Sequence, residues 1–238
     1  DLGGMAPGSL PPAATEVHQE GLRLPPLRLT PEVRELIAAS SRTPDERAGD
    51  LDAQWGANAV GVARLAQLAG APLGEVLDHG ERAMRAALDA APDGRWSFAD
   101  VIDSVGPRAE QQSPSTVAVT IEIAGDEVGV DFAGTAAQRP GNVNAPLAVT
   151  ESAALFALVS VLDPGLPANG GAFRPVTVRA EPGTIVHAVA PVAVGAGNVE
   201  VSQRVADVCL GALAQALPCR VPAAGQGTMN NVVLGAAS

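Results

Sequence analysis

The sequence contains no lysine, and all 15 of its basic residues are arginine. This absence excludes three kinds of site: a Schiff base on a lysine amine, a lysine general base, and the lysine of a phosphate-binding loop. Arginine remains available, and its planar guanidinium can grip a carboxylate through two parallel hydrogen bonds. Any nucleophile or base must therefore come from other kinds of side chain.

Tyrosine is also absent, aromatic residues make up only 3% of the chain, and the formal net charge is -11. Binding of nucleic acid needs a basic face and usually stacking aromatic side chains. We therefore expect no nucleic-acid partner. Apolar runs are all too short to span a bilayer, and the first residues lack a signal-peptide pattern, so we expect no membrane contact and a cytoplasmic protein.

Two cysteines, Cys209 and Cys219, are too few for a disulfide framework, which fits a reducing cytoplasm. Cys209 lies on the apolar side of a predicted helix, and free cysteine is usually buried, so we expect its burial. The three histidines, at positions 18, 79 and 187, are far apart and match no zinc signature.

Helical signals dominate the first 94 residues, after an irregular stretch over 1–30 that is rich in glycine and proline. Two of the expected helices begin with Thr-Pro and an acidic first turn, which is typical of a helix start. The three expected helices are "TPEVRELIAASS", "RTPDERAGDLDAQWGANAVGVARLAQLAG" and "APLGEVLDHGERAMRAALDAAPDG".

The periodicity then changes. "STVAVTIEIAGDEVGVDFAGT" alternates apolar and polar residues around Gly125-Asp126, which predicts a β-hairpin. We further expect a surface linker over 104–114, a buried helix in "LAVTESAALFALVSVLDP", two short strands in "FRPVTVRAEPGTIVHAV", a helix over 199–217 and a strand in "MNNVVLGA".

This order predicts an α+β fold, with a loop and helical part over 1–94 and a mixed α/β part over 95–238. The chain opens on Asp1 without an initiator methionine, so we expect an internal fragment of a larger subunit.

One short stretch concentrates polar chemistry at the start of the last predicted helix. "VGAGNVEVSQRVADV" places Asn198, Glu200, Gln203 and Arg204 among small apolar residues. Asn198 is a plausible N-cap, and Glu200 and Arg204 share a face because they are four residues apart. A capped helix with a surface ion pair explains this pattern. Spacing alone favours this explanation, and a site for an anion at the positive end of the helix is the alternative.

Three other loops carry polar side chains. "RPGNVNAP" holds Asn142 and Asn144 in a turn framed by glycine and proline, which ordinary turn chemistry also explains. "GQGTMNN" contains Asn230 but lacks the strand–loop–helix order of a nucleotide-binding loop. The N-terminal loop gathers ionisable residues whose spacing defines no metal site: Asp1, Glu16, His18, Glu20 and Arg23.

Seven blocks, which together span essentially the whole chain, resemble the hydantoinase B/oxoprolinase family. Several ordered blocks are far more specific than any single motif. They are "DLGGMAPGSLPP", "TEVHQEGLRLPP", "RTPDERAGDLDAQWGAN", "GVDFAGTAAQRPGNVNAPLAVT", "NGGAFRPVTV", "GNVEVSQRVADVCLGALAQA" and "GQGTMNN".

The resemblance implies a B-type subunit of an ATP-dependent enzyme that opens cyclic amides such as hydantoins, 5-oxoproline or lactams. It implies a hydantoinase A-like partner subunit or domain that binds ATP and phosphorylates the substrate oxygen, which would account for the missing phosphate loop. It also implies a divalent metal (Mn, Zn or Mg) in the full-length B-type subunit, where a metal-bound water could attack the activated carbonyl.

Under this resemblance, Glu16 and Glu20 are candidate catalytic bases, and Asp1 is a candidate metal ligand whose histidine partners are expected before it. Amide and guanidinium groups suit the ring amide and a carboxylate of the substrate. The candidate substrate-binding residues are Arg23, Asn142, Asn144, Asn198, Glu200, Gln203, Arg204 and Asn230.

Two departures from the family pattern leave the substrate open. His18 stands where relatives often carry an aromatic residue, and the segment 104–114 lacks an acidic, glycine-rich character. Two alternatives therefore remain: a subunit of an acetone-type ketone carboxylase, and a catalytically silent assembly subunit whose polar loops contact the A-type partner.

Overall fold

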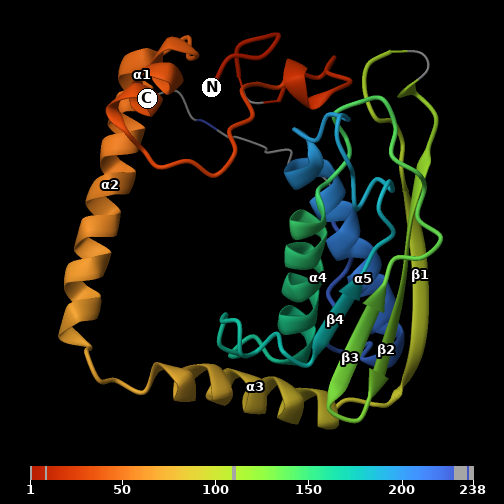
Figure 1. The fold of residues 1–238 in the computed structure, drawn as a ribbon. Helices are drawn as coiled ribbons and strands as arrows, with labels where there is room; N and C mark the ends of the chain where they lie inside the picture. Colours follow the sequence, from red (N-terminus) through yellow and green to blue (C-terminus); the bar gives the residue numbers. More distant parts are fainter. Residues whose placement is uncertain (1, 9, 109–110, 228–234, 236–238) are drawn as a thin grey trace.

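A computed structural model describes residues 2–8, 10–108, 111–227 and 235. It contains a four-stranded mixed sheet in the order β1-β2-β3-β4, which lies on the side of the molecule away from α1 (Pro31–Ala39) and α2 (Pro44–Gln67) (Figure 1). The first three strands are antiparallel neighbours, and the last pair is parallel. The strands are β1 (Gly94–Ile102), β2 (Ser115–Ala124), β3 (Glu127–Asp131) and β4 (Val176–Arg179).

The hairpin predicted around Gly125 is confirmed as the turn between β2 and β3. Gly125 has a φ of +59°, a left-handed conformation that glycine adopts without a side-chain clash. Alternate residues of β2 point into the core, because successive side chains of a strand face opposite sides. Those buried positions are Val117, Val119, Ile121 and Ile123.

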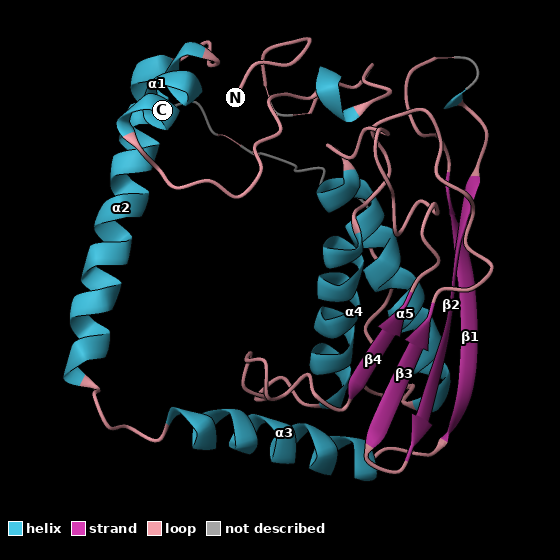
Figure 2. Ribbon diagram, in the orientation of Figure 1, coloured by secondary structure: helices cyan, strands magenta, loops and turns pink. Residues whose placement is uncertain are grey.

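Two helices cover one face of the sheet: α4 (Leu147–Leu162) and α5 (Ser202–Ala216) (Figure 2). A parallel strand pair needs a long crossover, and α4 provides it between β3 and β4. The helix α5 packs against α4, β1 and β2. The α+β prediction is therefore confirmed, as is the burial of Cys209, which raises the pKa of its thiol to about 12.

The N-terminal part contains a short 3-10 helix (Val17–Gln19), α1 (Pro31–Ala39), α2 (Pro44–Gln67) and α3 (Leu73–Asp89). The predicted start of α1 is confirmed, because the side chain of Thr30 accepts a hydrogen bond from the Val33 N–H at 3.4 Å. The helix α3 buries Met84 and Leu88 in the core, whereas α2 has no buried residue and contacts mainly α1.

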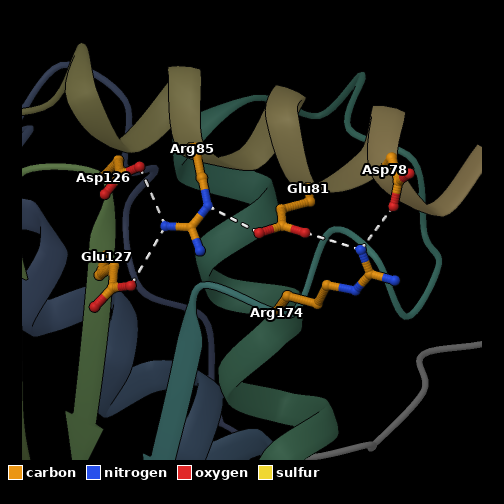
Figure 3. Close-up of polar contacts among 6 residues, drawn as sticks. All are labelled: Asp78, Glu81, Arg85, Asp126, Glu127 and Arg174. Atoms are coloured by element: carbon orange, nitrogen blue, oxygen red, sulfur yellow. Dashed lines mark hydrogen bonds and ion pairs between the residues drawn. The ribbon is translucent and has the colours of Figure 1, made fainter. Parts of the chain in front are cut away.

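Ion pairs attach α3 to the rest of the molecule (Figure 3). Glu81 lies between Arg174 at 2.9 Å and Arg85 at 3.0 Å, and these two guanidinium groups lower the pKa of its carboxyl. Arg85 also reaches Asp126 at 3.1 Å, in the turn between β2 and β3. The network therefore links α3 both to that turn and to the loop before β4.

The structure differs from the sequence predictions in three places. The strand β1 was not predicted, because its polar and apolar residues do not alternate regularly as they do in a typical half-buried strand. The second strand predicted in "FRPVTVRAEPGTIVHAV" is wrong: Pro182 and Gly183 form a turn, and only isolated bridges at Thr184 join this segment to others.

The surface linker predicted over 104–114 is wrong in part. Val105 is fully buried and Gln111 is 1% exposed, because the segment folds back against the loop that begins at Pro140. The strand predicted in "MNNVVLGA" lies almost wholly outside the described residues.

Candidate functional site

The stretch that opens the last helix forms a π-helical turn (Gly197–Val201) that continues into α5. Such turns occur frequently at functional sites. Gly197 lies against the 144–145 backbone, and a Cβ there would collide with the carbonyl oxygen of Asn144. The N-cap predicted at Asn198 is wrong, because the helical turn already begins at Gly197 and Asn198 lies exposed inside it.

Glu20, from the N-terminal loop, holds the turn just before this helix. Its carboxylate accepts one hydrogen bond from the Val194 N–H at 2.9 Å and another from the Gly195 N–H at 2.6 Å. A Cβ on Gly195 would lie 2.7 Å from Oε1 of Glu20, so glycine permits this close approach. Hydrogen bonds to a charged acceptor are about twice as strong as neutral ones.

Asn142 and Asn144 hold the same turn from its other side. The Asn142 carbonyl accepts from the Ala196 N–H at 3.0 Å, and its amide donates to the Pro11 carbonyl at 3.0 Å. The Asn144 amide is fully buried and donates to the carbonyl of Ala193 at 3.0 Å. The same amide donates to two further carbonyls, and its oxygen accepts from the Arg139 N–H at 3.0 Å.

Three segments that are distant in sequence therefore meet around residues 193–197. The structure brings together Glu20, Asn142 and Asn144 at this turn. The side chains of Glu20 and Asn144 and the backbone carbonyl of Asn142 each contact its backbone, so these residues position the turn. Gln111, which the sequence analysis missed, supports it further: its amide donates to the Pro140 carbonyl at 2.6 Å. A single glutamine in an irregular segment gives no sequence signal of burial.

Asn198, Glu200 and Gln203 lie on the outer side of the same helix start, where Asn198 is exposed and the other two are half-buried. Partial burial raises the pKa of the Glu200 carboxyl, and the positive charge of Arg204 opposes this effect. A half-buried carboxyl with a raised pKa is poised to exchange a proton nearer neutral pH than an ordinary glutamate.

Arg204 faces a different set of partners. Its guanidinium pairs with Asp100 of β1 and with Asp207, the latter at 3.7 Å, and its side chain is 19% exposed. The pKa of the Asp207 carboxyl is raised above its usual value, mainly by burial. The positive charge of Arg204 opposes this effect, and the negative charge of Asp100 adds to it. Sequence analysis selected neither Asp100 nor Asp207 as a partner of Arg204. For Asp100 the reason is that the strand β1, on which it lies, was not predicted. These contacts attach α5 to the edge of the sheet.

The remaining candidates do not join this cluster. Glu16 and Arg23 lie exposed on the N-terminal loop, where the backbone at Glu16 bridges to Val192. Asp1 and Asn230 lie outside the described residues.

The described residues do not supply a metal site. Within ranges 2–8, 10–108 and 111–227, no group of three or more His, Cys, Asp or Glu side chains is close enough to hold a metal ion. The metal implied by the resemblance therefore does not fit the described side chains.

In that same part of the chain, none of the helices combines the length and apolar character needed to cross a membrane.

The sequence was compared with protein families and with known proteins. The hydantoinase B/oxoprolinase model matches residues 1–238. An uncharacterized protein of Methanocaldococcus jannaschii is 35% identical over 99% of the chain and 43% of its own length. The caprolactamase subunit beta of Pseudomonas jessenii is 31% identical over 94% of the chain and 40% of its own length.

Two solved structures have a similar fold. The crystal structure of the ATP-dependent caprolactamase from Pseudomonas jessenii superposes with a TM-score of 0.82 at 29% identity, over 92% of this chain and 40% of that one. A nucleotide-free acetone carboxylase shares the fold, with a TM-score of 0.76 at 16% identity, over 92% of this chain and 32% of that one. The chain thus spans less than half the length of these relatives, and it belongs to the hydantoinase B/oxoprolinase family.

Proposed function

We propose that this chain forms part of the B-type subunit of an ATP-dependent cyclic-amide hydrolase, which opens a lactam, a hydantoin or 5-oxoproline. The observation that carries the proposal is the set of contacts around 193–197, where Glu20, Asn142 and Asn144 fix the start of a π-helical turn. Fixed backbone of this kind preorganises the groups that follow it. The similarity to a caprolactamase subunit supports the reaction class.

The residues divide into two roles under this proposal. Glu20, Asn142 and Asn144 are positioning residues, because their polar atoms are occupied by backbone partners. Asn198, Glu200 and Gln203 face the substrate: the amides bind the ring amide, and the Glu200 carboxyl accepts or donates a proton during hydrolysis. Arg204 orients this helix through Asp100.

The remaining parts of the reaction are assigned to other components. ATP binds a hydantoinase A-like partner, because this sequence has no lysine for a phosphate loop and the caprolactamase relative is named as a subunit beta. A divalent metal, if the subunit uses one, needs ligands besides the described side chains, so no step here runs through it. We propose a cytoplasmic location, in line with the two cysteines and the acidic composition.

The test is reconstitution of the full-length B-type subunit that contains this chain with an A-type ATP-binding subunit, followed by measurement of released phosphate and of product. Caprolactam, 5-oxoproline, hydantoin, and acetone with bicarbonate are compared at equal concentration. We expect a cyclic amide to stimulate ATP hydrolysis and to yield a ring-opened carboxylate.

Two outcomes would contradict the proposal. Turnover with acetone and bicarbonate alone would identify a ketone carboxylase subunit, the alternative that the shared fold with acetone carboxylase favours. A complex that assembles and binds ATP but hydrolyses it with none of these compounds would identify a silent assembly subunit.

A further inference from the structure

The segment 217–227 runs back along α5 to the start of that helix. The helix ends at Ala216, yet the backbone of Gly227 lies beside the side chains of Arg204 and Asp207, in the first two turns. From Arg204 to Ala216 the helix rises roughly 18 Å, so the segment returns along most of its length. Residues 222–226 are exposed, whereas Gly227 is half-buried. Gly227 is therefore where the returning segment meets the start of α5.

Two features of Gly227 require glycine at this contact. Its φ of +73° is a left-handed conformation that residues with a side chain rarely adopt. A Cβ on Gly227 would lie 2.8 Å from Oδ2 of Asp207 and 2.9 Å from Nη2 of Arg204, and both distances are too short for atoms that are not bonded. Glycine therefore permits both the turn of the backbone and its close approach to these two charged groups.

The guanidinium group of Arg204 is enclosed by three parts of the chain. Its Nη1 pairs with Asp100 of β1 and, at 3.7 Å, with Asp207 of α5, while its Nη2 lies against Gly227. Its Nε is buried and has no hydrogen-bond partner among the described residues. A group added at Gly227 therefore cannot displace this guanidinium without weakening its pair with Asp100, because hydrogen bonds to charged groups depend on their geometry.

Arg204 in turn sets the surroundings of Glu200. The two residues are four positions apart, so they share a face of the helix start. The positive charge of Arg204 opposes the rise in the pKa of the Glu200 carboxyl that burial causes. We propose that Gly227 is a positioning residue, whose backbone packs on Arg204 and Asp207 and holds the guanidinium in its place beside Glu200. This inference rests on the proposed role of Glu200 in the hydrolysis.

The first test is of the contact itself, by thermal unfolding of the full-length B-type subunit. Gly227→Ala should lower the melting temperature by at least about 2 °C. The fall should be smaller in an Asp207→Ala background, because that substitution removes the nearest colliding atom. Gly225→Ala is the matched control: a Cβ there would meet nothing within 4 Å, and its φ is not left-handed. Equal falls for Gly227→Ala in both backgrounds would overturn the proposal.

The second test is of positioning, by steady-state kinetics of the complex with its A-type partner, below the melting temperature of every variant. With a cyclic amide as substrate, Gly227→Ala should lower kcat at least about tenfold and leave KM nearly unchanged, whereas Gly225→Ala should change neither. A wild-type kcat for Gly227→Ala, or a change in KM alone, would overturn the positioning role. Because the stability test needs no turnover, failure of the contact and failure of the proposed function are distinguishable.

Discussion

Glu20→Gln tests whether this carboxylate is the support for the helix start. In the wild type, two carboxylate oxygens each accept one backbone hydrogen bond, from Val194 at 2.9 Å and Gly195 at 2.6 Å. Glutamine has nearly the same shape but only one acceptor oxygen. Its NH₂ group would then point at a backbone N–H, so that two donors face each other.

The expected cost follows from these two contacts. One hydrogen bond to a charged acceptor is lost, and one half-buried N–H is left without a partner, which together cost about 2 kcal/mol. For a domain of this size, that corresponds to a fall in melting temperature of roughly 4–8 °C. The direction does not depend on whether Glu20 also takes part in the chemistry.

The assay is thermal unfolding followed by circular dichroism, with Glu16→Gln as the matched control. Glu16 belongs to the same loop but is exposed, so its substitution should change the melting temperature by less than about 2 °C. Equal melting temperatures for Glu20→Gln and the wild type would refute the positioning role of Glu20.

Three further outcomes follow from the structure. Asn144→Leu removes a fully buried amide whose donors and acceptor are all used, and urea denaturation should show a loss of about 3–4 kcal/mol. Because burial raises the pKa of Glu200 above 4.5, its charged form costs stability at neutral pH. Glu200→Gln should therefore increase the free energy of unfolding at pH 7, and the gain should vanish below about pH 4.5; a loss at pH 7 would contradict this. Arg174→Met should speed hydrogen exchange in α3, with a difference that shrinks at high salt, whereas Arg95→Met should not.

The sequence predicted those helices and strands whose formation depends on residues close together in the chain. Thr30 with Pro31 marks the start of α1, and alternation around Gly125 marks the β2–β3 hairpin. The long apolar segment of α4 and the stripe that buries Cys209 in α5 are equally local. The strand β1 was missed because its pairing with β2, rather than its own pattern, determines it.

The site was predictable only in part for the same reason. The family resemblance selected Glu20, Asn142 and Asn144, and these residues do meet. That they contact backbone around 193–197 depends on loop geometry across 49 residues of chain for Asn144 and 174 for Glu20, which spacing alone does not encode. Sequence spacing also suggested Glu200 as the partner of Arg204, whereas the guanidinium pairs with Asp100 and Asp207.

The most direct test of the account is the kinetics of Glu200→Gln in the complete complex with its A-type partner. If Glu200 faces the substrate and handles a proton, kcat/KM for cyclic-amide-dependent ATP hydrolysis should fall at least about tenfold while the protein becomes more stable at pH 7. The control Glu35→Gln, exposed on α1, should leave both quantities unchanged. A Glu200→Gln complex with wild-type kcat/KM would contradict the assignment of this helix start to the active site.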